Sequence, residues 1–169
     1  MADVQIKGLA ELQTFMDQLP AKLEANVMRG ALRAGMKTVQ TEAQKNLYQS
    51  GTAKTYELMA GLKVSTRIKN GTVMARLRAS GKHAFIAYWM EFTGAKPHDI
   101  KPKRRKSLFI AGMFGEIVHH PGFRPRPFMR PALDGQSQNA VVAAAEYIKN
   151  RLATKNGLDT ADIEIEVES

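Results

Sequence analysis

The chain has 169 residues, an apolar content of 44% and a formal net charge of +9. This length suits one domain that can bury a core unaided, and the lack of cysteine excludes disulfides and thiolate metal sites. No stretch approaches the roughly 20 apolar residues of a membrane span, and residues 1–8 lack the apolar core of a secretion signal. We expect a single domain, 1–169, that folds in a reducing cytoplasm and has no membrane partner.

Two helices are predicted at the N-terminal end. Apolar residues recur at helical spacing from Leu9 to Leu19. Pro20 suits the first turn of a second helix, which should run to about Leu47. The buried stripe of this second helix is predicted to comprise Met28, Leu32, Met36, Val39, Ala43 and Leu47. A cationic row along its edge consists of Arg29, Arg33 and Lys37.

Two glycines, Gly30 and Gly35, lie inside the second helix, where each costs on the order of 1 kcal/mol relative to alanine. This cost indicates that another backbone approaches the helix closely at these positions. A backbone of the same subunit is favoured over one from a neighbouring copy.

A β-hairpin is predicted after residue 61, because apolar and cationic residues alternate there. Asn70-Gly71 supplies a type I′ turn, so Lys63 lies opposite Arg78. The outer face of the hairpin carries Lys63, Arg67, Lys69, Arg76 and Arg78. Like charges placed opposite each other destabilise a ladder, so an anion is expected nearby.

The C-terminal segment is a candidate for that anion. It contains Asp159, Asp162, Glu164, Glu166 and Glu168 and no base. Ile163, Ile165 and Val167 alternate with these acids, which predicts a strand over about 160–168 with one apolar and one acidic face. Such a strand could add to a sheet edge of its own subunit or of a neighbour, so its apolar residues are candidate interface residues.

The middle of the chain is predicted to hold a buried element and an inserted loop. Residues 85–92 are almost all apolar, with Glu91 as the one carboxylate in the run. A structural ion pair between Glu91 and an arginine of the later Pro-rich segment is favoured over an acid or base role, because no second catalytic group accompanies it. An insertion over about 95–122 should contain a second hairpin that pairs 107–110 with 116–119.

The insertion begins with a basic loop over residues 96–106, in which Asp99 is the only acid. Its candidate interface residues are Lys101, Lys103, Arg104, Arg105 and Lys106. Such a loop can face an acidic protein surface or hold phosphates. A solvated segment without a partner is the alternative.

The most distinctive segment is the Pro-rich arm, residues 120–127. Prolines at positions 121, 125, 127 and 131 fix φ and remove backbone donors, so the arm must be extended and loses little entropy on docking. Aromatic and arginine side chains are typical anchors of interfaces, and here they are Phe123, Arg124, Arg126, Phe128 and Arg130. A final helix is predicted from about Gln136 to Ala153, with Val141, Ala145, Ile148 and Leu152 facing inward.

No catalytic, metal or cofactor motif is evident. Ser80-Gly81-Lys82 lacks the earlier glycine of a P-loop. His119 and His120 are adjacent, so in a strand they would point to opposite faces and could not chelate one metal. We expect a protein that is not an enzyme and that has no cofactor.

Several short motifs resemble, in the same order, those of a known family. They are Ser50-Gly51 with Thr55-x-x-Leu58 and Gly61-Leu62-Lys63-Val64-Ser65, then Ala87-Tyr88-Trp89-Met90-Glu91-Phe92-Thr93-Gly94, then Lys96-Pro97-His98, Val118-x-His120-Pro121-Gly122 and Arg126-Pro127-Phe128-Met129-Arg130-Pro131-Ala132-Leu133. This set is similar to the head-tail joining, or tail-completion, proteins of long-tailed bacteriophages and prophages, which are related in fold to the minor tail protein Z of lambda-like phages. The matching structural positions are Glu91, Phe92, Gly94, Pro121, Gly122, Pro127 and Pro131.

The resemblance implies an α+β subunit whose long N-terminal and C-terminal helices pack on a mainly antiparallel sheet. It implies a homo-oligomeric ring, a hexamer in preference to a dodecamer, at the head-tail junction of the virion, assembled in the host cytoplasm. The implied partners are a tail terminator or tube protein, a head-closure or connector protein, and genomic DNA in the lumen. The alternative function is a nucleic-acid-binding domain that contacts phosphates through the basic loop 96–106 and the cationic hairpin face.

Overall fold

The computed structural model describes residues 7–51, 56–103, 107–110, 113–156, 160 and 163–165. The chain divides into two compact units: unit 1 comprises residues 1–84 and 128–169, and unit 2 comprises residues 85–127. Helices and antiparallel strand pairs both occur, so the predicted α+β class is confirmed. The predicted insertion covered about 95–122, whereas unit 2 begins at Phe85 and ends at Pro127.

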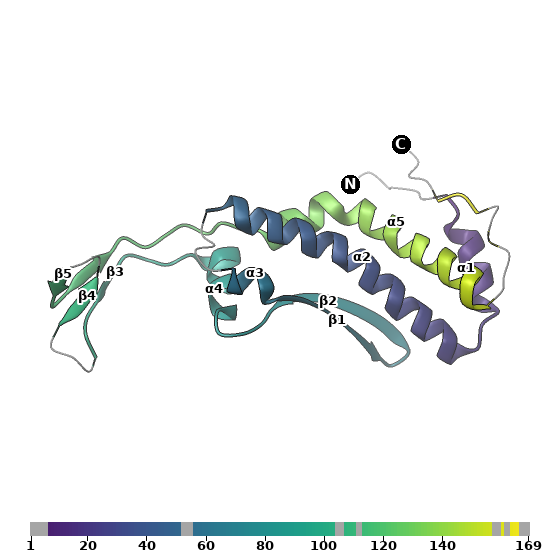
Figure 1. The fold of residues 1–169 in the computed structure, drawn as a ribbon, viewed down its shortest axis with the longest axis horizontal. Coiled ribbons are helices and arrows are strands. Elements are labelled where there is room, and N and C mark those ends of the chain that lie inside the picture. Colours follow the sequence, from purple (N-terminus) through teal and green to yellow (C-terminus); the bar gives the residue numbers. More distant parts are fainter. Residues whose placement is uncertain are drawn as a thin grey trace. The chain divides into compact units, whose positions relative to one another are not determined.

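Unit 1 is built around one long helix. Its elements are α1 (Leu9–Asp17), α2 (Ala21–Gln49), α3 (Glu57–Ala60), β1 (Leu62–Lys69), β2 (Thr72–Ala79) and α5 (Met129–Asn156). Helix α2 packs along α5 on one side and against the β1–β2 hairpin on another, and α1 packs on α5 (Figure 1). The prediction placed both long helices on a sheet, but the main partner of α5 is α2. None of the described helices combines the length and apolarity that crossing a membrane requires.

The buried line along α2 differs from the predicted stripe in its first half. It consists of Val27, Ala31, Gly35, Val39, Ala43 and Leu47. The prediction was right from Val39 onward, whereas the larger residues Met28, Leu32 and Met36 are only partly buried. The reason is the close approach of α5: a Cβ on Gly35 would lie 2.4 Å from the carbonyl oxygen of Ala140. Small residues therefore face α5, and the predicted backbone approach within the subunit is confirmed at Gly35.

The hairpin matches its predicted register, with Lys63 opposite Arg78 and Ile68 opposite Val73. Asn70 and Gly71 form the turn with φ of 51° and 78°, as a type I′ turn requires. The Gln40 side-chain amide donates to the Leu62 carbonyl oxygen at 2.6 Å, which ties the hairpin to α2. The five cations of the outer face are exposed, as predicted.

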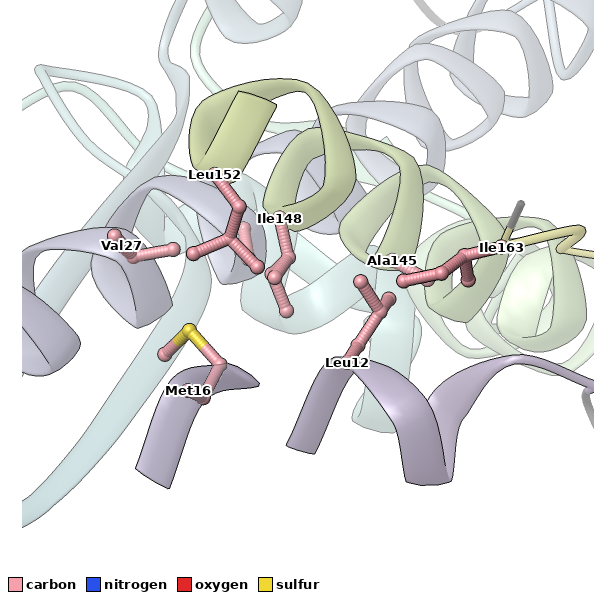
Figure 2. Close-up of a cluster of buried hydrophobic side chains, with 8 residues drawn as sticks. Leu12, Met16, Val27, Ala145, Ile148, Leu152 and Ile163 are labelled. Atoms are coloured by element: carbon pink, nitrogen blue, oxygen red, sulfur yellow. The ribbon is translucent and has the colours of Figure 1, made fainter. Parts of the chain in front are cut away.

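The predicted C-terminal strand is wrong in its described part. Residues 163–165 form no strand, and Ile163 is buried in a cluster with Leu12 and Met16 of α1, Val27 and Ala31 of α2, and Ala145, Ile148 and Leu152 of α5 (Figure 2). Ile165 packs partly buried against the same cluster. Burial in this cluster of three helices outweighs strand pairing here, because fully burying such a side chain contributes about 1.5–3 kcal/mol. Both isoleucines are internal to their own subunit, and Val167 lies outside the described residues.

Helix α5 begins earlier than predicted, at Met129 instead of Gln136. Pro131 lies in its first turn, where its missing N–H leaves no intrahelical bond unmade. Ala145, Ile148 and Leu152 are buried as predicted, but Val141 is exposed. At the start of the helix, Ala132 in its first turn and Phe128 directly before it are buried.

Unit 2 contains α4 (Ala84–Tyr88), the π-helical turn η1 (Trp89–Thr93), β3 (His98–Ile100), β4 (Leu108–Ile110), β5 (Met113–Gly115) and β6 (Val118–His120). The prediction paired 107–110 with 116–119. Instead, β4 pairs with β5, and β6 pairs with β3 from the predicted basic loop. Strands of three residues give too little alternation for their partners to be identified from the sequence.

Candidate assembly interface

The Pro-rich arm is fixed to its own unit by backbone hydrogen bonds. The arm leaves strand β6 and forms an antiparallel bridge in which the Ala95 N–H donates to the Phe123 carbonyl oxygen at 2.9 Å and the Phe123 N–H donates back at 2.9 Å. Further along, the Arg126 N–H donates to the Met90 carbonyl oxygen at 2.7 Å. The arm is extended as predicted, and its backbone partners lie in the same subunit.

Two glycines allow this approach. A Cβ on Gly94 would lie 2.3 Å from the Phe123 carbonyl oxygen, and a Cβ on Gly122 would lie 2.3 Å from the Ala95 carbonyl oxygen. Both glycines have positive φ, of 63° and 77°, which a side chain would strain. Two segments separated by more than twenty residues in the sequence therefore meet at positions that only glycine suits.

The side chains of the arm divide into two groups. Phe123, Arg124, Arg126 and Arg130 are exposed, as an interface requires. Phe128 is not an interface residue: its ring is buried in unit 1, and the Asn46 amide donates to its carbonyl oxygen at 3.2 Å. Phe128 stands between the extended arm and helix α5, and its ring enters the core of unit 1. The proline pattern of the arm gave no sign of this burial.

Four exposed aromatic residues are grouped in the segment 85–92, which was predicted to be buried. The aromatic face, as we call it, consists of Phe85, Tyr88, Trp89 and Phe92, which are between 44% and 57% exposed. The Phe85 and Trp89 rings meet edge to face at 5.2 Å, and the Tyr88 and Phe92 rings lie 5.3 Å apart. Contiguous exposed aromatic groups of this kind mark interaction sites in soluble proteins.

Helical geometry explains why these rings share one face. The four aromatic residues follow each other at intervals of three, one and three positions, which a helix places on one side. The interleaved residues Ala87, Met90 and Glu91 are buried. The π turn is closed by the Gly94 N–H, which donates to the Trp89 carbonyl oxygen at 2.7 Å, and π turns are frequent at functional sites. The helical spacing of the aromatic residues was the sequence signal that could have placed them on one face.

Two of the five predicted interface cations of the basic loop belong to the described residues. Lys101 and Lys103 are exposed, and Arg104, Arg105 and Lys106 lie outside the described residues. Asp99 lies 2.9 Å from Nδ1 of His119, so this acid is engaged by the neighbouring strand β6. Exposed lysines suit an anionic partner.

The predicted opposition of the two histidines is confirmed. His119 faces Asp99, whereas the His120 ring stacks on that of His98 with centroids 5.0 Å apart. Among the described residues, no group of three or more side chains is arranged to hold a metal ion. The predicted ion pair between Glu91 and an arm arginine stays a prediction, although Glu91 is buried.

The chain was compared with family models, with curated proteins and with solved structures. The chain matches no family model, no curated protein and no solved structure.

Proposed function

We propose that the chain is a non-enzymatic structural protein of a bacteriophage virion, which forms a ring at the head-tail junction as a tail-completion or head-tail joining subunit. The resemblance of its motifs to that family motivates the proposal. In the virion the ring would be a hexamer in preference to a dodecamer, with a tail terminator or tube protein on one side, a head-closure or connector protein on the other, and genomic DNA in the lumen.

One observation carries the proposal furthest. The motifs 87–94 and 118–122 are remote in the sequence, yet Gly94 packs on Phe123, the residue after the second motif, and Gly122 packs on Ala95, the residue after the first. The motif glycines therefore serve one local structure, the docked arm. Unit 2 also carries the exposed aromatic side chains of the aromatic face and the exposed Arg124 and Arg126, which are residue types that stable protein contacts use.

Assembly is the direct test. The purified protein, mixed with tails that lack this subunit, should bind at one tail end in negative-stain images and should restore joining to heads. Trp89→Ala should weaken this binding, because it removes a large ring from the aromatic face. Tyr48→Ala provides the control, since Tyr48 is an exposed aromatic residue of α2 in unit 1, with 60% of its surface exposed against 44% for Trp89. A protein that stays monomeric and never binds tails would contradict the proposal.

The alternative is a nucleic-acid-binding domain, and the cationic hairpin face favours it. Lys63 and Arg78 are paired across the ladder, both are exposed, and no described strand of the chain covers them. This function predicts binding of duplex DNA that weakens steeply with salt, because binding would release counterions from the phosphates. Lys63→Glu with Arg78→Glu should abolish such binding, and binding that is absent or insensitive to salt would exclude it.

A further inference from the structure

A groove in unit 1 runs along α2 and has a volume of about 350 Å³. Arg29, Arg33 and Lys37 of α2 line it, together with Thr66 of β1 and Tyr147 of α5. The three cations are exposed and successive ones are four residues apart, so on an α-helix they are spaced by about 6 Å along one side. The groove is therefore a linear cationic surface.

Neighbouring groups shape this groove and leave its charge uncompensated. The Tyr147 ring lies across Gly30, where a Cβ would be 2.3 Å from ring atoms, so the glycine makes room for the ring that lines the groove. The Arg33 guanidinium is oriented by a 3.5 Å hydrogen bond to the Thr66 hydroxyl. Among the described residues, Glu164, Glu42, Glu57 and Asp99 form ion pairs with Lys7, Lys45, His83 and His119, and none of these four pairs involves a cation of the groove.

The acidic C-terminal segment of this chain has the complementary pattern. Glu164, Glu166 and Glu168 alternate along the sequence, and alternate residues of an extended chain are about 6.6–6.8 Å apart. Across three charges this spacing differs from that of the groove by less than about 2 Å, a difference that arginine and lysine side chains can absorb. Glu164 pairs with Lys7 at 3.6 Å, but both groups are exposed, and exposed pairs exchange partners at little cost.

The described part of the segment lies on the side of α5 away from the groove. The Lys149 ammonium donates to the Ile163 carbonyl oxygen, and the Thr160 hydroxyl donates to the Lys149 carbonyl oxygen. Lys149 and Tyr147 are two residues apart, which corresponds to about 200° around a helix. Residues 163–165 and the groove therefore lie on different sides of α5, an arrangement that suits a contact between copies.

We infer that the groove binds the acidic C-terminal segment, residues 164–168, of a second copy of this chain. Each subunit inserts its segment into one neighbour and receives the segment of the other. Such a head-to-tail contact is heterologous, and contacts of this type generate rings when the rotation closes. The inference rests on the proposed ring and identifies one of the contacts that would close it.

Charge variants of the full chain test this contact. The groove variant carries Arg29→Glu, Arg33→Glu and Lys37→Glu, and the tail variant carries Glu164→Gln, Glu166→Gln and Glu168→Gln. In sedimentation velocity each variant alone should associate at least about tenfold more weakly than the unmodified chain. Mixing the two variants should yield dimers and nothing larger, because only one groove and one tail remain complementary. Raising the ionic strength from about 0.05 M to about 0.5 M should dissociate the unmodified assemblies.

A matched control separates the groove from charge in general. Arg67→Glu, Lys69→Glu and Arg76→Glu make the same change in net charge on the exposed outer face of the hairpin, and this variant should associate like the unmodified chain. All the substituted side chains are on the surface or outside the described residues, and circular dichroism checks that each variant is folded.

Two outcomes would overturn the inference. Groove and tail variants that associate normally would remove the contact and leave the ring itself standing. A groove that binds a 30-base-pair DNA duplex but not a peptide of residues 160–169 would assign the groove to phosphates. If the unmodified chain neither associates nor joins tails, the proposed function fails. Binding of the peptide of residues 160–169 then tests the groove by itself: the unmodified peptide should bind, and the same peptide with glutamine in place of each glutamate should not.

Discussion

Replacing Gly35 by alanine should destabilise the protein, although alanine favours a helix interior by about 1 kcal/mol relative to glycine. Gly35 is buried in α2, and a Cβ there would lie 2.4 Å from the Ala140 carbonyl oxygen and 3.2 Å from its carbonyl carbon. Both atoms belong to the backbone of α5, so the contact can be relieved only if the two helices separate. Overpacking of this kind costs about 1–3 kcal/mol, which leaves a net loss of up to about 2 kcal/mol.

Gly135→Ala is the matched control. Gly135 lies inside α5, and a Cβ at this position would meet nothing within 4 Å. The same substitution should therefore stabilise the protein by about 0.5–1 kcal/mol through helix propensity alone. The two substitutions are chemically identical, so their difference isolates the approach of α5 to α2.

Urea denaturation followed by far-UV circular dichroism measures both changes. At this chain length the loss at Gly35 corresponds to a fall in the melting temperature of up to roughly 8 °C. The midpoint should fall for Gly35→Ala and rise for Gly135→Ala, with m unchanged. If both substitutions raised the midpoint equally, α5 would not lie against Gly35, and the small-residue line of α2 would need another explanation.

Three further perturbations test the arm and the aromatic face. Phe128→Ala should cost about 3–5 kcal/mol in the free energy of unfolding, measured by urea titration, because it empties a fully buried site; a loss below about 1 kcal/mol would place the ring outside the core. Gly94→Ala should release the arm from Ala95 and make it cleave faster in limited proteolysis, and an unchanged cleavage rate would contradict the close approach at Phe123. Trp89 is the only tryptophan, so its fluorescence should shift to the blue and become less accessible to acrylamide on assembly; an unchanged spectrum in assembled particles would remove the aromatic face from the contact.

The sequence predicted best where a local signal acts alone. Asn70-Gly71 determines both the turn and the register of the hairpin, because its positive φ values favour a tight two-residue turn. The alternation of apolar and cationic residues along both strands agrees with this register, since a shift by one residue would move every side chain to the other face of the sheet. The arm was equally predictable, since proline restricts its own φ and that of its neighbour whatever the surroundings. Helix α2 was predicted to within two residues of its end at Gln49.

The sequence predicted worst where tertiary contacts decide. A hydrophobicity pattern ranks Met28 and Met36 above Ala31 and Gly35, yet the closeness of α5 selects the smaller residues. Ile163 sits in an alternating pattern typical of a strand, but burial against α1 and α5 takes precedence. In the segment 85–92 the apolar content suggested burial. The helical spacing of its aromatic residues places them on one side, but the same spacing is typical of a buried face, so their exposure could not be predicted from the sequence.

The distribution of buried residues between the two units favours an assembly role for unit 2. Of the buried apolar residues that the structure describes, only Ala87 and Met90 lie in unit 2, and the rest lie in unit 1. The described strands of unit 2 form two-stranded ladders of three residues each, and ladders of this size are marginal in water without a surface to pack on. A unit with so small a core and four exposed aromatic rings gains most when a partner covers the rings, because about 25 cal/mol is gained for each Å² of apolar surface removed from water. Unit 1 therefore holds most of the described buried core, whereas unit 2 would gain more stability from a partner that covers its aromatic rings.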